Sequence, residues 1–290
     1  MCYHIAVHDV TQFANQSTVN MDTECTEKDK LLQSVMQGRL EFFRSCSIYS
    51  PLPGAAFQKN RDGSFYCSSG IDFACCNAII GDKDTIPSDK EIENAIEFFG
   101  SHQLPFHWWS SAKNLEAKGF QFGGILTGIA LDISNDLPNT KTTSKVQIKI
   151  THEKEGLNVF TNLFGNAFGM KPNAFAQFQA VSTAAMNKGE QVHFLAFVDG
   201  KPVGTATLAT CPASAGIWSL STLPEFRKNG VGSALVSAAL AEAKKRKYDQ
   251  VMAILMPKGM AWGLFTKLGF KEVCKFPFYV YGVSAKEFEK

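Results

Sequence analysis

The sequence lacks a long apolar run, a Cys-x-x-Cys pair and a basic stripe with interleaved aromatic residues. Without an apolar run of about 18 residues, we expect no transmembrane helix and no membrane partner. The eight cysteines are scattered without histidines at zinc spacing, so we expect no metal site and reduced thiols, as in the cytosol. The missing basic stripe argues against nucleic acid as a partner.

The first residues, Met1-Cys2-Tyr3-His4, also lack the basic and apolar regions of a secretion signal. This favours a cytoplasmic location. A secreted effector that works in a host cytosol would have the same composition, so that alternative stays open.

With 290 residues and 45% apolar content, the chain is long enough for two globular domains. Residues 134–145 form the only long stretch without an apolar pattern, which predicts domains at 1–136 and 145–290. Residues 1–140 contain 10 Lys and Arg against 17 Asp and Glu, a net charge of −7. Residues 141–290 contain 19 against 10, a net charge of +9, so the second half is the better host for a polyanion.

The first half begins with a weakly patterned lead-in at residues 1–28. Apolar spacing then predicts one or two helices over 31–47 and a helix over 89–102, the latter with Ser88 as N-cap and Glu91 in a capping box. We expect a hairpin around Arg61-Asp62-Gly63, strands over 74–80 and 104–109, a strand or hairpin arm over 123–133, and a short helix over 111–117. The tandem residues Trp108 and Trp109 are interpreted as core or seam residues rather than a ligand cage.

In the second half we expect strands over 146–150, 192–198, 203–208, 217–222, 250–255 and 272–281. Helices are predicted over 158–170, 174–185, the stripe that begins at Val231, and 260–268. Asp199-Gly200 indicates a hairpin between the second and third of these strands.

A glycine loop, Arg227-Lys228-Asn229-Gly230-Val231-Gly232, stands where the strand over 217–222 should end and a helix begin. Two glycines at this spacing allow a sharp turn that points several backbone N–H groups at one anion on the helix N-terminus. The expected ligand is a phosphate or pyrophosphate. The corresponding first-half loop, residues 81–87, has no paired glycines and two aspartates, so it should repel a phosphate.

Residues 190–281 resemble the GCN5-related N-acetyltransferase (GNAT) superfamily. The resemblance lies in Arg227, Gly230 and Gly232, which match Arg/Gln-x-x-Gly-x-Gly/Ala, and in the closing Leu268-Gly269-Phe270. It implies that acetyl-CoA is bound, with its pyrophosphate on residues 227–233. The cofactor-binding residues implied by the family are Leu220, Ser221, Thr222, Arg227, Lys228, Asn229, Gly230, Val231, Gly232 and Ser233.

The position of the family's usual general acid, a tyrosine five residues before the phenylalanine of Leu-Gly-Phe, is here Phe265. Phenylalanine has no proton to give. Water or another residue would then serve, with Tyr279 and Tyr281 as candidates. Glu225 and His193 are the candidate bases, and a surface glutamate and an ordinary strand histidine are the alternative interpretations.

The first half has an echo of the same family, because residues 115–120 parallel residues 265–270. The whole chain thus resembles bacterial tandem-GNAT proteins with a degenerate first domain. The resemblance implies an α/β (α+β) fold of two tandem GNAT-like domains, each a mixed, mostly antiparallel twisted sheet flanked by helices.

The implied function is acetyl-CoA-dependent transfer of acetyl to a primary amine of a small molecule or protein, with the acidic half walling the acceptor site. The alternative is a non-catalytic or weakly catalytic CoA-binding module, which Phe265 favours. Nothing in the sequence identifies the acceptor or the oligomeric state.

Overall fold

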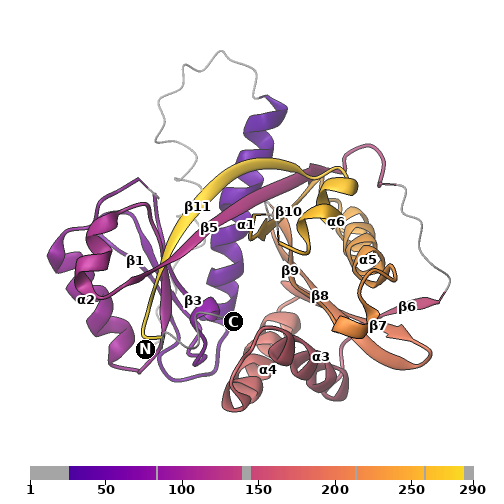
Figure 1. Ribbon diagram of the computed structural model, residues 1–290, viewed down its shortest axis with the longest axis horizontal. Helices are drawn as coiled ribbons and strands as arrows, with labels where there is room; N and C mark the ends of the chain where they lie inside the picture. Colours follow the sequence, from indigo (N-terminus) through magenta and orange to yellow (C-terminus); the bar gives the residue numbers. More distant parts are fainter. Residues whose placement is uncertain (1–25, 83, 139–144, 213, 258, 284–290) are drawn as a thin grey trace.

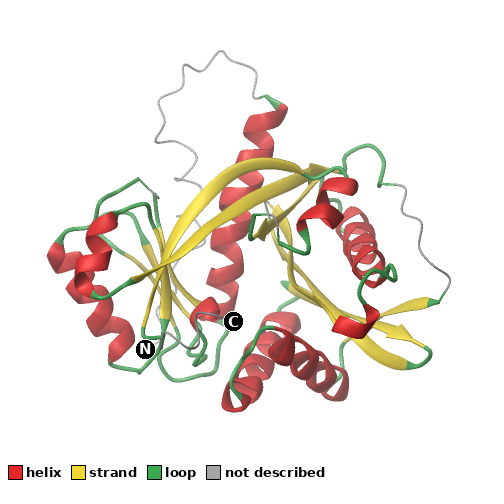
Figure 2. Cartoon of the chain, in the orientation of Figure 1, coloured by secondary structure: helices red, strands yellow, loops and turns green. Residues whose placement is uncertain are grey.

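All the strands of the computed structural model belong to one open sheet flanked by helices (Figures 1 and 2). The structure describes residues 26–82, 84–138, 145–212, 214–257 and 259–283. Within them the sheet has eleven strands in the order β1-β2-β3-β4-β11-β5-β10-β9-β8-β7-β6. Only the β3/β4 and β10/β9 pairs are parallel, so the sheet is mixed and mostly antiparallel as expected.

The first half contains α1 (Glu27–Ile48), β1 (Ala56–Lys59), β2 (Phe65–Ser68), η2 (Ala74–Cys76), β3 (Asn77–Ile80), α2 (Asp89–Gly100), β4 (Phe106–Trp109), η3 (Lys113–Lys118) and β5 (Gln121–Asp132). The second half contains β6 (Val146–Thr151), α3 (Lys154–Ala167), α4 (Pro172–Asn187), β7 (Gln191–Val198), β8 (Lys201–Cys211), β9 (Ser214–Thr222), η4 (Pro224–Phe226), α5 (Val231–Lys245), β10 (Gln250–Leu255), α6 (Trp262–Lys267) and β11 (Lys271–Tyr281).

Most of the expected elements are present. The hairpins at residues 61–63 and 199–200 pair antiparallel, and Ser88 forms the expected capping box with Glu91. The strand expected over 74–80 begins with the 3₁₀ turn η2, and the short helix expected over 111–117 is the 3₁₀ helix η3. Residues 1–25 of the lead-in lie outside the described residues. None of the described helices is both long and apolar enough to cross a bilayer.

The two halves exchange their last strands. β5 leaves the first half and pairs with β10, whereas β11 leaves the second half and pairs with β4. β5 and β11 also pair with each other and form the long curved bridge seen in Figure 1. Each half therefore completes its part of the sheet with backbone hydrogen bonds from the other.

Helices cover both faces of this sheet, and the residues that the structure describes form four hydrophobic cores. In the second half, α5 and α6 pack on one face, and α3 and α4 pack on the other. In the first half, α2 covers one face. On the opposite face α1 packs against strands of both halves, including β2, β9, β10 and β11. One helix from the first half thus helps to cover the second.

The predicted echo between the halves is visible as one repeated helix ending. Gly119 and Gly269 both adopt the left-handed conformation, with φ of 88° and 87°. In each case the N–H of the residue after the glycine donates to the carbonyl five positions earlier. Phe120 donates to the Leu115 carbonyl, and Phe270 donates to the Phe265 carbonyl. This is the Schellman ending, in which glycine permits the positive φ and an apolar contact closes the turn.

The predicted division into domains at 1–136 and 145–290 stays a prediction, because residues 139–144 of the expected linker lie outside the described residues. The sheet, however, runs across this division. The end of β5 is also fixed to the second half, because the Lys244 ammonium donates to the backbone carbonyls of Ile133, Ser134 and Asn135.

We expect that neither fragment 1–136 nor fragment 145–290 folds alone, because each would expose a strand edge that normally pairs with the other. Circular dichroism and amide NMR dispersion of the separate fragments check this, and co-expression should restore the native spectrum. Native dispersion from either isolated fragment would contradict the expectation.

Candidate functional site

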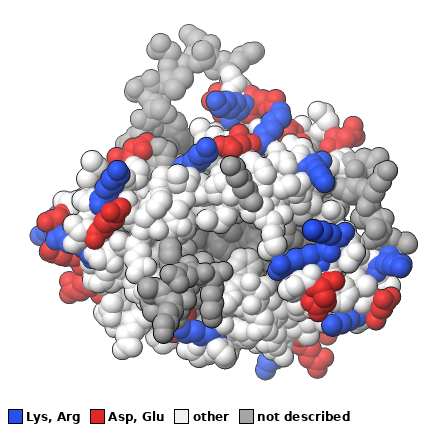
Figure 3. All heavy atoms as spheres, viewed as in Figure 1, with Lys and Arg blue, Asp and Glu red and all other residues white. Residues whose placement is uncertain are grey.

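Two neighbouring parallel strands, β9 and β10, diverge in the middle of the second half. Their pairing ends at Ile217 with Ala253, whereas β9 continues to Thr222 and β10 to Leu255. Among the described residues, the last part of β9 therefore has a strand partner only on its β8 edge. On the β10 edge, the backbone groups of this part of β9 have no hydrogen-bonded strand beside them and face an opening. Figure 3 shows a hollow in the middle of the molecular face, with basic side chains on its rim.

A β-bulge lies in β9 where it leaves β10. Ser219 has a φ of 50°, and the register with β8 shifts so that Ser219 and Leu220 oppose one residue. Thr205 of β8 holds the bulge, because its hydroxyl donates to the Ser219 carbonyl at 2.8 Å. The Thr205 oxygen also lies 2.7 Å from the Ser221 hydroxyl, which must then be the donor. Bulges bend a strand and redirect its backbone groups, here beside the opening.

The glycine loop continues directly from this strand. Arg227 turns back so that its Nε donates to the Thr222 carbonyl at 3.2 Å. Lys228 and Gly230 both have positive φ, 63° and 82°, and Gly230 is the N-cap of α5. Only glycine adopts this conformation routinely, which explains Gly230. The loop therefore connects the open end of β9 to the first turn of α5.

The first turn of α5 has backbone donors without a partner inside the helix. The first helical hydrogen bond runs from the Ala234 N–H to the Gly230 carbonyl, so the N–H groups of Val231, Gly232 and Ser233 precede it. No side chain caps this end of the helix. Arg227 and Lys228 are exposed beside it. A helix N-terminus with free N–H groups and two adjacent cations fits a phosphate or pyrophosphate.

Close packing keeps this end of the helix against the sheet. Gly204 lies in β8, and a Cβ there would come within 2.7 Å of the Ser221 carbonyl oxygen and 3.0 Å of a Val231 methyl group. A Cβ on Gly232 lies 3.1 Å from Leu264 of α6. The absence of a side chain at Gly204 thus lets β9 and α5 approach each other.

The corresponding place in the first half has neither diverging parallel strands nor an uncapped helix N-terminus. β3 and β4 remain paired up to Ile80 and Trp109, so no opening forms between them. The N-terminus of α2 is occupied by its own side chains, because Ser88 accepts from the Glu91 N–H and Glu91 accepts from the Ser88 N–H. Asp89 adds a second negative charge to this turn. The geometry and the charge both disfavour an anion there.

The candidate acids and bases are spread over the molecule rather than gathered at the opening. Glu225 lies on η4 near the loop, with its carboxylate 3.7 Å from the Lys201 ammonium and 55% of its side chain exposed. Tyr279 is buried in the α2-side core of the first half, where its hydroxyl donates to Glu116. Burial and the Glu116 carboxylate raise the pKa of Tyr279.

Tyr281 shares that distant location, since its ring contacts Phe106 and Phe120. Along β5, Tyr279 pairs with Phe122, whereas the end of β10 pairs with Thr127. Five strand residues correspond to about 16 Å. The structure therefore does not bring the two tyrosines to the glycine loop.

His193 lies under α3 and α4 and is 1% exposed. Its Nδ1 is 2.9 Å from the Thr207 hydroxyl, its ring packs on Phe160, and its Nε2 has no hydrogen-bond partner. Burial lowers the pKa of His193 from 6.5 to about 4. The imidazole is therefore neutral at pH 7 and enclosed by helices.

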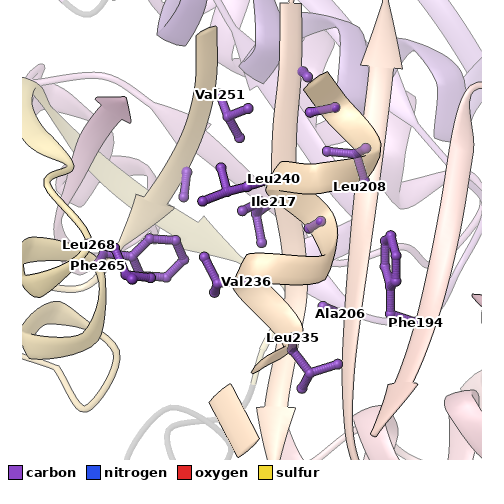
Figure 4. Close-up of a cluster of buried hydrophobic side chains, with 14 of the residues drawn as sticks. Phe194, Ala206, Leu208, Ile217, Leu235, Val236, Leu240, Val251, Phe265 and Leu268 are labelled. Atoms are coloured by element: carbon purple, nitrogen blue, oxygen red, sulfur yellow. The ribbon is translucent and has the colours of Figure 1, made fainter. Parts of the chain in front are cut away.

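Phe265 is a core residue, and packing accounts for its identity. It is 1% exposed and lies with Val236 and Leu268 on the α5 side of the sheet (Figure 4). Its ring meets Phe270 edge to face at 4.9 Å, which is the apolar contact of the Schellman ending. Its counterpart in the first half, Leu115, is equally buried. A nonpolar residue at position 265 is thus no sign of lost chemistry.

Residues 161–270 match the family model described as the acetyltransferase (GNAT) family. The match includes β9, the glycine loop and α5, and it ends at Phe270. These residues are similar to the GNAT family. The family expected from the glycine loop and Leu268-Gly269-Phe270 is therefore confirmed. No curated protein sequence matches the chain.

Solved structures share the architecture of nearly the whole chain. A GCN5-related N-acetyltransferase from Kribbella flavida is 15% identical, with 88% of this chain and 95% of that chain covered and a TM-score of 0.59. A tandem GNAT protein from the clavulanic acid biosynthesis pathway is 13% identical, with 87% and 96% covered and a TM-score of 0.53. A conserved protein from Staphylococcus epidermidis, described as functionally unknown, is 14% identical, with 79% and 94% covered and a TM-score of 0.60. At these identities the likeness shows the fold alone.

The buried His193 should make the protein less stable in acid. Its folded-state pKa is about 4 and its ordinary value is 6.5, so unfolding takes up a proton between these values. The free energy of unfolding should fall as pH decreases from about 6.5 toward 4, by at most about 1.4 kcal/mol per pH unit for this group. Urea denaturation at several pH values measures the slope.

His193→Gln should flatten this slope by the contribution of one group. His107, whose pKa burial also lowers to about 4, keeps its own contribution in the variant. Equal slopes in the variant and the parent protein would show that His193 does not titrate in this way.

Proposed function

We propose that this protein is an acetyl-CoA-dependent N-acetyltransferase that transfers the acetyl group to a primary amine of a small molecule or a protein. The supporting observation is the divergence of β9 from β10 directly beside the uncapped N-terminus of α5. One arm of a ligand can lie along the open edge of β9 while its pyrophosphate lies on the helix. Proteins of the GNAT family are acetyltransferases.

In this proposal the loop holds the pyrophosphate through backbone donors and cations. The N–H groups from Gly230 to Ser233 face the phosphate oxygens, and Arg227 and Lys228 supply positive charge. Leu220, Ser221 and Thr222 line the pantetheine arm with their backbone. Asn229 completes the loop between Lys228 and Gly230.

In this proposal the acetyl transfer relies mainly on backbone groups and needs few catalytic side chains. The amine nitrogen forms a bond to the thioester carbon, and the carbon–sulfur bond breaks. The nitrogen loses one proton, and the leaving thiolate takes up one proton. A backbone N–H of the bulge, directed at the carbonyl oxygen, can stabilise the developing negative charge. Binding both reactants on one strand edge supplies proximity.

Glu225 and water carry the proton transfer in this proposal. Glu225 is the candidate base that lies nearest the loop in sequence, and water is the candidate acid, since the hydroxyls of Tyr279 and Tyr281 lie in the other half. The alternative of a non-catalytic CoA-binding module loses its main argument, because Phe265 has a structural role.

Gly230→Asp should weaken acetyl-CoA binding strongly, by about tenfold or more, because it places a negative charge at the anion site. Asn and Asp both tolerate positive φ better than other side chains, so Gly230→Asn is the matched neutral control. Isothermal titration with acetyl-CoA measures both variants. Equal affinities for the Asp and Asn variants would refute the loop assignment, and no binding by the parent protein would refute the cofactor.

Turnover distinguishes the transferase from the binding module. We expect free CoA to be released when acetyl-CoA and a suitable amine are both present, because the bulge and the open strand edge are intact. A thiol reagent measures the release against an amine-free control. Tight acetyl-CoA binding without turnover on a broad amine and peptide panel would support the module instead.

A further inference from the structure

A continuous apolar surface lies on the α1 side of the opening. It consists of Phe42 from α1, Leu126 from β5, Trp218 from β9, Ile254 from β10 and Met256 just beyond β10, and we call it the apolar rim. The first four are partly exposed members of the core beneath α1, and Met256 is 50% exposed. The rim thus combines side chains of both halves.

The rim begins where the cofactor strand opens. Trp218 is the first residue of β9 beyond the last pair with β10, and Ser219 of the bulge follows it. The Phe42 and Trp218 rings stack in parallel, with centroids 4.0 Å apart and planes at 8°. A flat aromatic pair therefore lies next to the place proposed for the thioester.

The other side of the rim is aliphatic. Ile254 pairs with Gly128 of β5, and the Met256 methyl group lies 3.6 Å from where a Cβ on Gly124 would be. The Met256 side chain therefore lies over Gly124 of β5, whereas the space above Gly128 is filled by Val35, Cys274 and Phe276. Exposed apolar groups gathered in this way indicate a binding surface.

None of the five rim side chains carries charge. Glu41, next to Phe42 on α1, is paired with Arg44, and Arg44 also forms an ion pair with Glu190. A polycationic amine would need unpaired carboxylates. The lining instead matches an amine with an aromatic or aliphatic body.

We propose that the acceptor is a small primary amine whose apolar body, preferably aromatic, lies on the Phe42–Trp218 stack. This inference rests on the proposed acetyl transfer and names its substrate class. An apolar lining also lowers the pKa of an ammonium group, because burial disfavours the charged form. The acceptor then reaches the thioester as the free amine, with its proton released to solvent before the nitrogen–carbon bond forms.

The acceptor class is tested with phenethylamine, aniline, spermidine and a lysine-containing peptide at fixed acetyl-CoA. We expect phenethylamine and aniline to be acetylated with at least about tenfold higher kcat/KM than spermidine or the peptide. For phenethylamine, kcat/KM should rise tenfold per pH unit below the pKa of the amine, whereas for aniline, which is neutral at pH 7, it should be flat there. Preference for spermidine or the peptide would overturn the inference.

Variants test the stack itself. Trp218→Ala and Phe42→Ala should each raise the KM for phenethylamine up to about tenfold and leave the Kd for acetyl-CoA unchanged, and Trp218→Phe should restore most of the affinity. Phe57→Ala is the control, because Phe57 stacks on Phe65 in the same core but on the outer strand β1. A KM unchanged in both alanine variants, or raised equally in Phe57→Ala, would overturn the role of the stack.

Different results would refute the proposed acetyl-CoA-dependent function and the proposed acceptor class. No acetyl-CoA binding by the parent protein would refute the proposed function. Intact binding with acetylation of spermidine or the peptide, but of neither apolar amine, would refute the acceptor class alone.

Discussion

Backbone pairing between strands of different halves is the constraint on which the rest of this molecule depends. Because β5 fills the place beside β10 and β11 fills the place beside β4, the halves have no separate sheets. This arrangement keeps α1 across strands of both halves and brings Phe42 against Trp218. The first half is thus part of the surroundings of the site, although it lacks a glycine loop of its own.

The two halves follow one local plan with opposite results at the helix N-terminus. Each has two parallel strands, a helix after the first and a Schellman ending before the exchanged strand. In the first half the donors of α2 are used by Ser88 and Glu91, whereas α5 begins at Gly230 without a cap. A capped helix is stable without a ligand, and an uncapped one keeps its donors available to an anion.

Local signals in the sequence predicted most of the elements and the glycine loop, because periodicity, caps and turn residues act over a few positions. They also predicted the repeated ending at Gly119 and Gly269. The exchange could not be predicted, since alternation shows which face of a strand is buried but not which strand lies beside it. For this reason Tyr279 and Tyr281, expected near the site, lie in the other half. The sequence also contained a signal for the bulge that was missed. In β9 the residues that face the core are spaced by two positions from Ala215 to Ile217 but by three positions from Ile217 to Leu220.

The exchange also sets the order in which the protein can be completed during synthesis. His107 in β4 pairs with Val280, so this edge lacks its native partner until β11 has left the ribosome. Until then Phe106, Trp108 and Trp109, all buried in the finished protein, have an open strand edge beside them. The half that is made first is therefore the half that is finished last, and its aromatic edge is the part that most needs protection from aggregation while the second half is being translated.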